Sequence, residues 1–155
     1  MAANKIIPCL WIEKDAKKAA RYYISVFKKG KIISYQSFKQ SSSGSFDTAM
    51  VEVPGLRFQI LAAGPLFKFS EAMSFVITCK DQIEIDYYWK VLTSKGGEEQ
   101  ACGWLKDRYG LSWQVVPAQL SKLLVHKDKA KREYAMQKML TMKKIIIIDL
   151  IKAPK

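Results

Sequence analysis

The chain has 155 residues, of which 49% are apolar, and it carries a formal net charge of +12. This length suits one compact domain with a sizeable core, and no stretch approaches the roughly 20 apolar residues of a membrane-spanning helix. Residues 1–5 lack the apolar run of a signal peptide, so we expect a cytoplasmic protein that does not bind membranes. Cys9, Cys79 and Cys102 form no C-x-x-C pair, which favours reduced thiols over disulfides or a zinc site.

The positive charge comes mainly from lysine, since only four of the 26 basic residues are arginines. Specific recognition of phosphates and bases tends to favour the bidentate guanidinium of arginine. Residues 118–155 hold ten basic and three acidic side chains, spread along a helix-like pattern. We interpret this charge as a lysine-coated surface and do not expect nucleic-acid binding, although a nucleic-acid or acidic-partner binder stays open as an alternative.

In the first part of the chain, residues 5–12 are predicted to form a strand. Asp15 can cap a following helix, in which apolar residues recur at helical spacing as far as Phe27, and Gly30 stands where a glycine stop is common. A polar, serine-rich loop is predicted at 40–45. Three further strands are predicted, over 31–39, 46–53 and 57–62. This order is βαβββ.

The same order returns after a linker at 63–69. Residues 73–79 form a predicted strand, and Asp81 with Glu84 resembles a helix-capping arrangement. Residues 102–117 are predicted to form a β-hairpin, with its turn at 107–110. Beyond it, Pro117 can open a short helix, and a lysine-rich amphipathic helix is predicted over 128–144.

The last strands of the two halves repeat each other, because G-L-S-W-Q-V-V at 110–116 matches G-L-R-F-Q-I-L at 55–61 by residue type. An internal repeat indicates that the same structural unit occurs twice, so it is the first guide to the architecture. We therefore predict an α+β fold of two tandem βαβββ modules, at 5–62 and 73–117, with a C-terminal helical tail at 118–155. We expect them to form a single domain over residues 1–150.

Two βαβββ modules that end in a D-x-x-G-x-x-W-x strand resemble the vicinal oxygen chelate superfamily, which includes glyoxalase I, extradiol dioxygenases and bleomycin-resistance proteins. The local motifs are similar to the PhnB-like branch, often labelled demethylubiquinone methyltransferases. These motifs include P-C-L-W at 8–11, S-F at 74–75, C-G-W-L-K-D at 102–107 and S-W-Q at 112–114. The resemblance covers about residues 5–150. It implies a curled, glyoxalase-like sheet in which each module supplies half of a cleft, and a homodimer.

In metal-dependent members of the superfamily, four ligands come from the first and last strands of the two modules. The resemblance places these positions at Pro8, Gln59, Ser74 and Gln114. Proline has no side-chain donor, serine is a poor ligand for a catalytic divalent ion, and neutral glutamines supply no charge. His126 is the only histidine. We therefore expect no metal site.

No other cofactor is expected, because the eight glycines include no G-x-G of the kind that a doubly wound sheet uses to bind S-adenosylmethionine. Strand alternation then divides the side chains between two faces. The predicted ligand-binding cleft is lined by Leu10, Arg57, Gln59, Ser74, Trp104, Ser112 and Gln114. The opposite faces, predicted to form the core, carry Cys9, Trp11, Phe58, Ile60, Phe75, Ile77, Cys79, Trp113 and Val115.

This cleft combines apolar walls with amides and hydroxyls, which suits a small organic molecule held by shape and hydrogen bonds. Gln59 and Gln114 could equally bridge strands across the module interface. Cys102 is the only thiol retained as a candidate nucleophile, with a buried apolar role as its alternative. Our leading hypothesis is a metal-free small-molecule-binding protein. The alternatives are a divalent-metal-dependent lyase, isomerase or dioxygenase of the same superfamily, and an enzyme that uses no metal.

Overall fold

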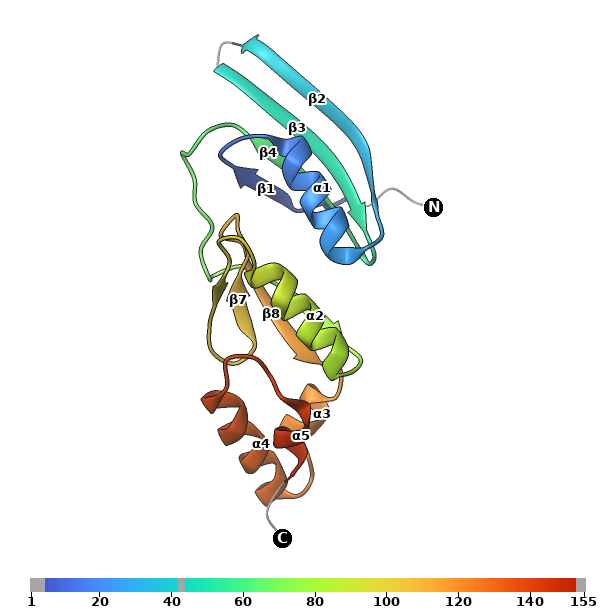
Figure 1. The fold of residues 1–155 in the computed structure, drawn as a ribbon, viewed down its shortest axis with the longest axis vertical. Helices are drawn as coiled ribbons and strands as arrows, with labels where there is room; N and C mark the ends of the chain where they lie inside the picture. The colour runs from blue at the N-terminus through green and yellow to red at the C-terminus, as the bar shows by residue number, and fades with distance from the viewer. Residues whose placement is uncertain (1–4, 42–43, 153–155) are drawn as a thin grey trace. The chain divides into compact units, whose positions relative to one another are not determined.

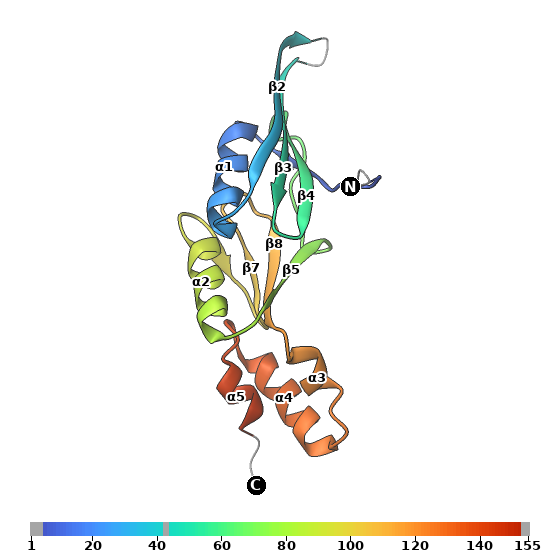
Figure 2. The same cartoon turned by 90° about the vertical axis from the view of Figure 1, so that its right-hand side faces the viewer.

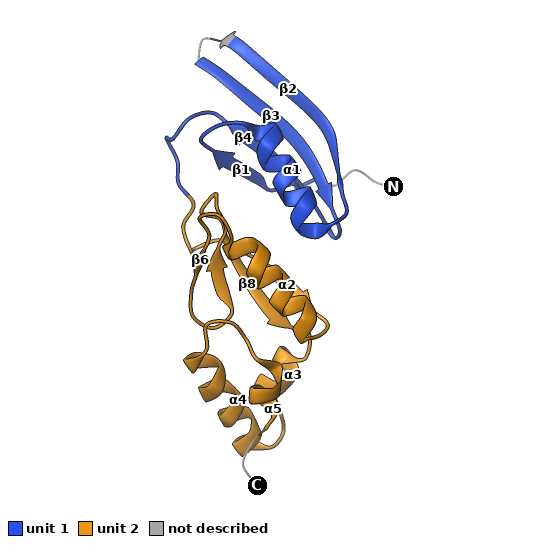
Figure 3. Cartoon of the chain, in the orientation of Figure 1, with its two compact units in different colours: residues 1–68 blue, residues 69–155 orange. Residues whose placement is uncertain are grey.

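The computed structural model describes residues 5–41 and 44–152 (Figure 1). The chain divides into two compact units, Met1–Lys68 and Phe69–Lys155 (Figure 3). Each unit has its own four-stranded sheet and contains one of the predicted modules. Each helix in the described part of the chain is too short or too polar to cross a bilayer.

Unit 1 has the predicted order βαβββ. Its elements are β1 (Cys9–Ile12), α1 (Ala16–Phe27), β2 (Lys31–Ser41), β3 (Gly44–Val53) and β4 (Leu56–Ala62). The strand order is β1-β4-β3-β2, with β1 parallel to β4 and the other pairs antiparallel. Helix α1 packs on one face of this sheet (Figure 2).

The core of unit 1 lies between α1 and the sheet. Asp15 caps the helix by accepting a hydrogen bond from the Lys18 amide at 2.9 Å. Small side chains on the buried face of α1 let the helix approach the strands closely, and the Tyr23 ring packs edge-on against Phe58 with centroids 5.5 Å apart. The buried residues of α1 are Ala16, Ala19, Ala20, Tyr22, Tyr23 and Val26.

Unit 2 repeats the architecture. Its elements are β5 (Ser74–Cys79), α2 (Gln82–Thr93), β6 (Glu98–Glu99), β7 (Trp104–Lys106) and β8 (Ser112–Pro117). The strand order β5-β8-β7-β6 matches that of unit 1, and β5 is parallel to β8. The prediction of two βαβββ modules is therefore confirmed.

Helix α2 packs against this sheet through Ile85, Trp89 and Leu92, which are buried. Asp81 accepts a hydrogen bond from the Glu84 amide at 2.9 Å, and Glu84 in turn accepts one from the Lys80 amide at 2.8 Å. The Asp81 cap agrees with the capping arrangement that the sequence predicts, but the Glu84 side chain reaches back to Lys80, one residue before the N-cap, and not to Asp81 itself.

The C-terminal tail forms three helices, α3 (Leu120–Leu124), α4 (Lys129–Thr141) and α5 (Ile147–Ile151), which lie together beyond one end of the unit 2 sheet (Figure 2). The segment before α5 is bound to the turn that precedes β7. Cys102 and Gly103 donate backbone hydrogen bonds to the carbonyls of Met142 and Lys143, both at 2.7 Å. Glycine is required here, because a Cβ on Gly103 would lie 2.9 Å from the Val115 carbonyl oxygen.

Candidate functional site

The face of the unit 2 sheet that is turned away from α2 is called its open face. Strand register pairs Ser74 with Ser112, Val76 with Gln114, and Gln114 with Trp104. Paired residues project to the same side, so these side chains share the open face. The superfamily resemblance, extended along each strand by alternation, predicts this grouping for β5 and β8. Ligand contact at these residues stays a prediction.

Gln114 and Ser74 are joined across β8 and β5, since the Gln114 amide nitrogen donates to the Ser74 hydroxyl oxygen at 2.9 Å. This bond fixes the orientation of the amide and leaves its carbonyl oxygen as an acceptor. This bond joins two strands within unit 2. Bridging across the module interface stays a prediction.

Ser112 lies between Ser74 of β5 and Lys106 of β7. Its side chain is fully buried, and its hydroxyl has no hydrogen-bond partner within the part of the chain that the structure describes. A buried polar group without a partner costs on the order of 1–3 kcal/mol. Ser112 is therefore a desolvated hydroxyl that can still donate and accept.

A charged pair borders the same face. The Lys106 ammonium lies 2.6 Å from a carboxylate oxygen of Glu71, which also accepts a bond from the Gln100 amide at 3.3 Å. The hydrogen bond from Lys106 holds the pKa of Glu71 below its ordinary value, and the same contact raises the pKa of Lys106. The sequence pattern does not reveal this pair, although Lys106 lies two residues after Trp104, which is predicted to line the cleft from the hairpin.

Asp107 holds the turn between β7 and β8. Its carboxylate is buried and accepts bonds from the Tyr109 amide at 2.8 Å, the Leu111 amide at 3.2 Å and the Trp113 indole at 2.9 Å. Gly110 completes the turn with a φ of 82°. Because both carboxylate oxygens are engaged, Asp107 has a structural role.

In unit 1, β1 presents the opposite face from the one predicted. Register places Leu10 beside Ile60 and Cys9 beside Gln59. Leu10 is only 2% exposed and belongs to the core, whereas Cys9 is exposed. This corrects the prediction that Leu10 lines the ligand cleft and that Cys9 and Trp11 are core residues.

The physical reason is one extra residue between strand and helix. Gln59 pairs with Cys9, whereas its repeat Gln114 pairs with Val76, 67 positions later, and the two helix-capping aspartates are only 66 positions apart. Unit 1 accommodates the extra residue with a left-handed backbone at Asp15, whose φ is 60°. A slip of one residue moves every side chain of a strand to the other face.

The open face of unit 1, opposite α1, therefore includes Cys9 and Trp11 together with Gln59. The Trp11 indole donates to the Gly64 carbonyl at 2.8 Å and meets the Phe67 ring edge-on at 4.9 Å. Partial burial raises the pKa of the Cys9 thiol, which keeps it protonated and weakly nucleophilic at neutral pH.

Arg57, another predicted cleft residue, is engaged by Glu52 on the neighbouring strand β3. The hydrogen bond from Arg57 lowers the pKa of Glu52, and Lys31 adds a second ion pair at 3.5 Å. The guanidinium is therefore already partly neutralised.

Cys102, the candidate nucleophile, lies in the turn before β7 with a left-handed φ of 58°. Its side chain is half-buried, and its backbone N–H donates to Met142 as described above. This backbone bond fixes the turn beside Trp104. A catalytic role for the thiol stays a prediction.

The donor positions implied by the resemblance do not fit a divalent metal. Ser74 and Gln114 are already bonded to each other, and Gln59 is a neutral amide. The corrected register matches Ser74 with Ile7 instead of Pro8, and neither residue offers a side-chain donor. Among residues 5–41 and 44–152 there is no group of three or more His, Cys, Asp or Glu side chains that could hold a metal ion. We therefore derive no chemistry through a metal.

A family model described as 3-demethylubiquinone-9 3-methyltransferase matches residues 4–116. The chain belongs to this family. Its PhnB-like assignment within the vicinal oxygen chelate superfamily, which the sequence motifs indicate, is confirmed. The match ends before the tail helices α3 to α5.

Solved structures of the family's fold agree with this assignment. The PhnB protein from Bacillus cereus is 28% identical, with 74% of this chain and 100% of that chain covered and a TM-score of 0.65. Protein PA1353 from Pseudomonas aeruginosa is 17% identical, with coverage of 74% and 98% and a TM-score of 0.61. A comparison with curated proteins found no match.

A third likeness is to the fosfomycin resistance protein FosX from Listeria monocytogenes, in a structure with Mn(II) and 1S,2S-dihydroxypropylphosphonic acid. It is 16% identical, with 74% of this chain and 92% of that chain covered and a TM-score of 0.56. This likeness supports the glyoxalase-like α+β fold.

Proposed function

We propose that this protein binds a small organic molecule on the open face of the unit 2 sheet, without a metal ion or other cofactor. The observation that carries the proposal is the polar group on the open face of unit 2. There the bonded pair of Ser74 and Gln114 adjoins the buried hydroxyl of Ser112, which has no partner among the described residues. Such a group can bind a ligand that both donates and accepts hydrogen bonds.

Trp104 gives this polar group an apolar neighbour. Its register partner is Gln114, so its indole stands beside the amide on the same face. An aromatic wall next to convergent polar groups is typical of small-molecule sites. The thiols of Cys9 and Cys79, whose pKa values are both raised, are poor nucleophiles, which leaves Cys102 as the one thiol to test for covalent chemistry.

A thermal-shift screen of small organic compounds in chelator-treated buffer tests the proposal. A ligand found in this way is then titrated into Gln114→Leu, which removes the amide but keeps similar bulk. We expect a loss of affinity of at least tenfold, because the Ser74 hydroxyl also loses its partner. The matched control is Gln137→Leu, which replaces an exposed glutamine of α4 and is expected to leave the affinity unchanged. Equal effects in both variants would contradict the proposal.

Metal analysis of protein purified without chelator tests the metal-free part of the proposal. We expect substoichiometric metal and no stabilisation by zinc, nickel or manganese. Stoichiometric metal together with a raised melting temperature would favour a metal-dependent enzyme instead. Titration with S-adenosylmethionine tests the activity in the family description, and saturable binding would favour a methyltransferase.

The resemblance further supports a homodimer, and we include this assembly, with a cytoplasmic location, in the proposal. Sedimentation velocity is expected to give the mass of two chains. A monomer at micromolar concentration would contradict the proposed homodimer. It would not bear on ligand binding, which the titrations test separately.

A further inference from the structure

Unit 2 contains a hollow outside its open face, where the tail meets the start of α2. Its volume is about 440 Å³, within the range of roughly 300–1,000 Å³ found for small-molecule sites. One part of it is lined by isoleucines, at 146, 147, 148 and 151, and another part is lined by Lys80, Asp81, Gln82 and Gln119. The isoleucines and Gln119 lie beyond residue 116, where the family match ends.

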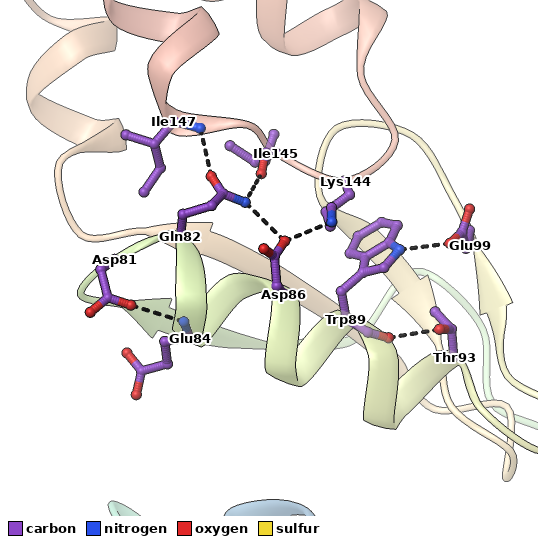
Figure 4. A network of polar contacts seen from close by, with 10 residues as sticks. All are labelled: Asp81, Gln82, Glu84, Asp86, Trp89, Thr93, Glu99, Lys144, Ile145 and Ile147. Carbon is purple, nitrogen blue, oxygen red and sulfur yellow. Dashed lines mark hydrogen bonds and ion pairs between the residues drawn. The ribbon is translucent and has the colours of Figure 1, made fainter.

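The isoleucine wall is held in place by Gln82. Its amide nitrogen donates to the Ile145 carbonyl at 3.1 Å, and its carbonyl oxygen accepts from the Ile147 amide at 2.8 Å (Figure 4). Lys144 adds an ion pair to Asp86 of α2 at 2.6 Å (Figure 4). Ile145 is fully buried between these contacts. The hollow is therefore formed before any ligand arrives, which lowers the cost of binding.

The wall is apolar and partly open to water. Ile148 is 47% exposed and Ile151 is 51% exposed, so an occupant would remove aliphatic surface from solvent. Branching at Cβ makes isoleucine side chains stiff. These properties suit an alkyl chain.

The polar side of the hollow holds one ammonium group, that of Lys80, and one carboxylate, that of Asp81. Asp81 is engaged by the Glu84 amide and by Lys80, so the exposed Lys80 ammonium is the group that can pair with an anionic head group. The Lys80 side chain is 79% exposed, and its ammonium is 4.0 Å from the nearest carboxylate, that of Asp81. Asp81 and Glu84 each accept a bond from a backbone amide, as described above. Gln119 makes no side-chain capping bond to α3. A net charge of +12 adds a general attraction for anions.

We propose that this hollow binds a medium-chain aliphatic carboxylate. The alkyl chain packs against the isoleucines, and the carboxylate lies near Lys80 and Gln119. The site is separate from the open faces and belongs to the tail that follows the family match.

Calorimetric titration of the full chain with hexanoate, octanoate and decanoate, each below its micelle concentration, tests this proposal. We expect one site per chain and an affinity that rises about fourfold for each added methylene group. Acetate, which carries the head group alone, is expected to give no measurable binding. Absence of decanoate binding, or an affinity that does not depend on chain length, would overturn the proposal.

Single substitutions locate the site. Ile148→Asp is expected to weaken decanoate binding at least tenfold, and Lys80→Gln is expected to weaken it a few-fold and reduce its salt dependence. The matched control is Ile83→Asp, because Ile83 is 80% exposed on α2 and does not line the hollow. Equal losses in Ile148→Asp and Ile83→Asp would overturn the assignment.

Gln114→Leu separates this inference from the proposed function. Decanoate binding that survives Gln114→Leu and is lost in Ile148→Asp supports the tail site. The reverse pattern would place the carboxylate on the open face and overturn the inference. A dimer that dissociates in Ile148→Asp without any decanoate binding would assign the isoleucines to contact with a second copy and would also overturn it.

Discussion

Asp107 shows how one buried charge is accommodated by local geometry. Three donors converge on its carboxylate, two from the turn backbone and one from the Trp113 indole. Charge-assisted bonds of this kind stabilise a turn and also hold the adjoining strand in register. The side chain therefore links the turn to the start of β8.

Asp107→Asn tests this role. The amide nitrogen of asparagine cannot accept a hydrogen bond, so one of the three donors is left buried without a partner. We expect the free energy of unfolding to fall by roughly 2–4 kcal/mol in urea titrations. Asp128→Asn is the control, because Asp128 caps α4 at the surface and asparagine caps equally well. Similar losses in both variants would contradict the assignment.

Cys79 makes stability depend on pH. Burial, with smaller contributions from Glu84 and Asp81, raises the pKa of its thiol from an ordinary value of 9.0 to about 12. The folded protein therefore keeps this proton while the unfolded chain loses it near pH 9. The contribution to stability is complete below pH 9 and is lost as the pH rises toward 12.

The corresponding measurement compares the free energy of unfolding of the wild type and Cys79→Ala from pH 8 to pH 11. Tyrosines and lysines titrate in both proteins, so the difference between the two curves isolates the thiol. We expect the wild type to lose stability more steeply above pH 9. Parallel curves would show that Cys79 titrates normally in the folded protein.

At the scale of elements, the first strand of each unit has the same pairing but a different connection to its helix. In unit 1 the extra residue before α1 reverses the faces of β1, so that Leu10 enters the core and Cys9 the open face. The two open faces are therefore chemically different. A thiol and an indole lie on one, and hydroxyls lie on the other.

Alanine substitutions test this register. Leu10→Ala is expected to lower the free energy of unfolding by about 2–5 kcal/mol, because it leaves a cavity under α1. Cys9→Ala is expected to change it by less than about 1 kcal/mol. Urea titrations of the two variants decide the point, and the opposite ranking would restore the face assignment made from the sequence.

Gln82 contributes two hydrogen bonds to the docking of the tail, beside the Lys144–Asp86 ion pair and the backbone bonds of Cys102 and Gly103. Gln82→Ala removes both bonds to the segment before α5, and we expect a loss of about 1–3 kcal/mol. Hydrogen exchange at the Ile147 amide is expected to become faster. Gln137→Ala, on the exposed face of α4, provides the control. Unchanged exchange at Ile147 would show that other contacts hold the tail.

At the scale of the whole molecule, charge is the property that most invites a different function. The net charge of +12 is carried mainly by lysines, and several of them already pair with carboxylates, as in the bonds of Lys106 and Lys144. A charge of this size promotes weak association with any polyanion. It does not by itself create a specific site.

A measurement of binding to duplex DNA distinguishes weak association with polyanions from a specific nucleic-acid site. We expect any binding at low salt to fall steeply as salt rises and to be unmeasurable at about 150 mM, because it rests on release of counterions. Fluorescence anisotropy across a salt series makes the measurement. Binding that persists at physiological salt and distinguishes between sequences would support the nucleic-acid alternative.

The order of the elements could be predicted from the sequence because its signals are local. Capping residues, turn glycines and the alternation of apolar residues act over a few positions. The repeat around Gln59 and Gln114 shows the pattern of the last strand twice, once in each module. The same alternation grouped Ser74, Ser112 and Gln114 on one face. It also placed Leu10 on the wrong face. Alternation separates the side chains of a strand into two sets, but it does not show which set faces the core.

Tertiary structure decided what depends on contacts between distant residues. The face of β1 follows from its pairing with β4, and Glu71 reaches Lys106 across 35 positions of sequence. Gln82 binds a segment more than 60 residues further along the chain. Local periodicity is encoded within a few neighbouring residues, whereas register, burial and docking depend on which distant surfaces exclude water from each other, and only the folded chain determines that.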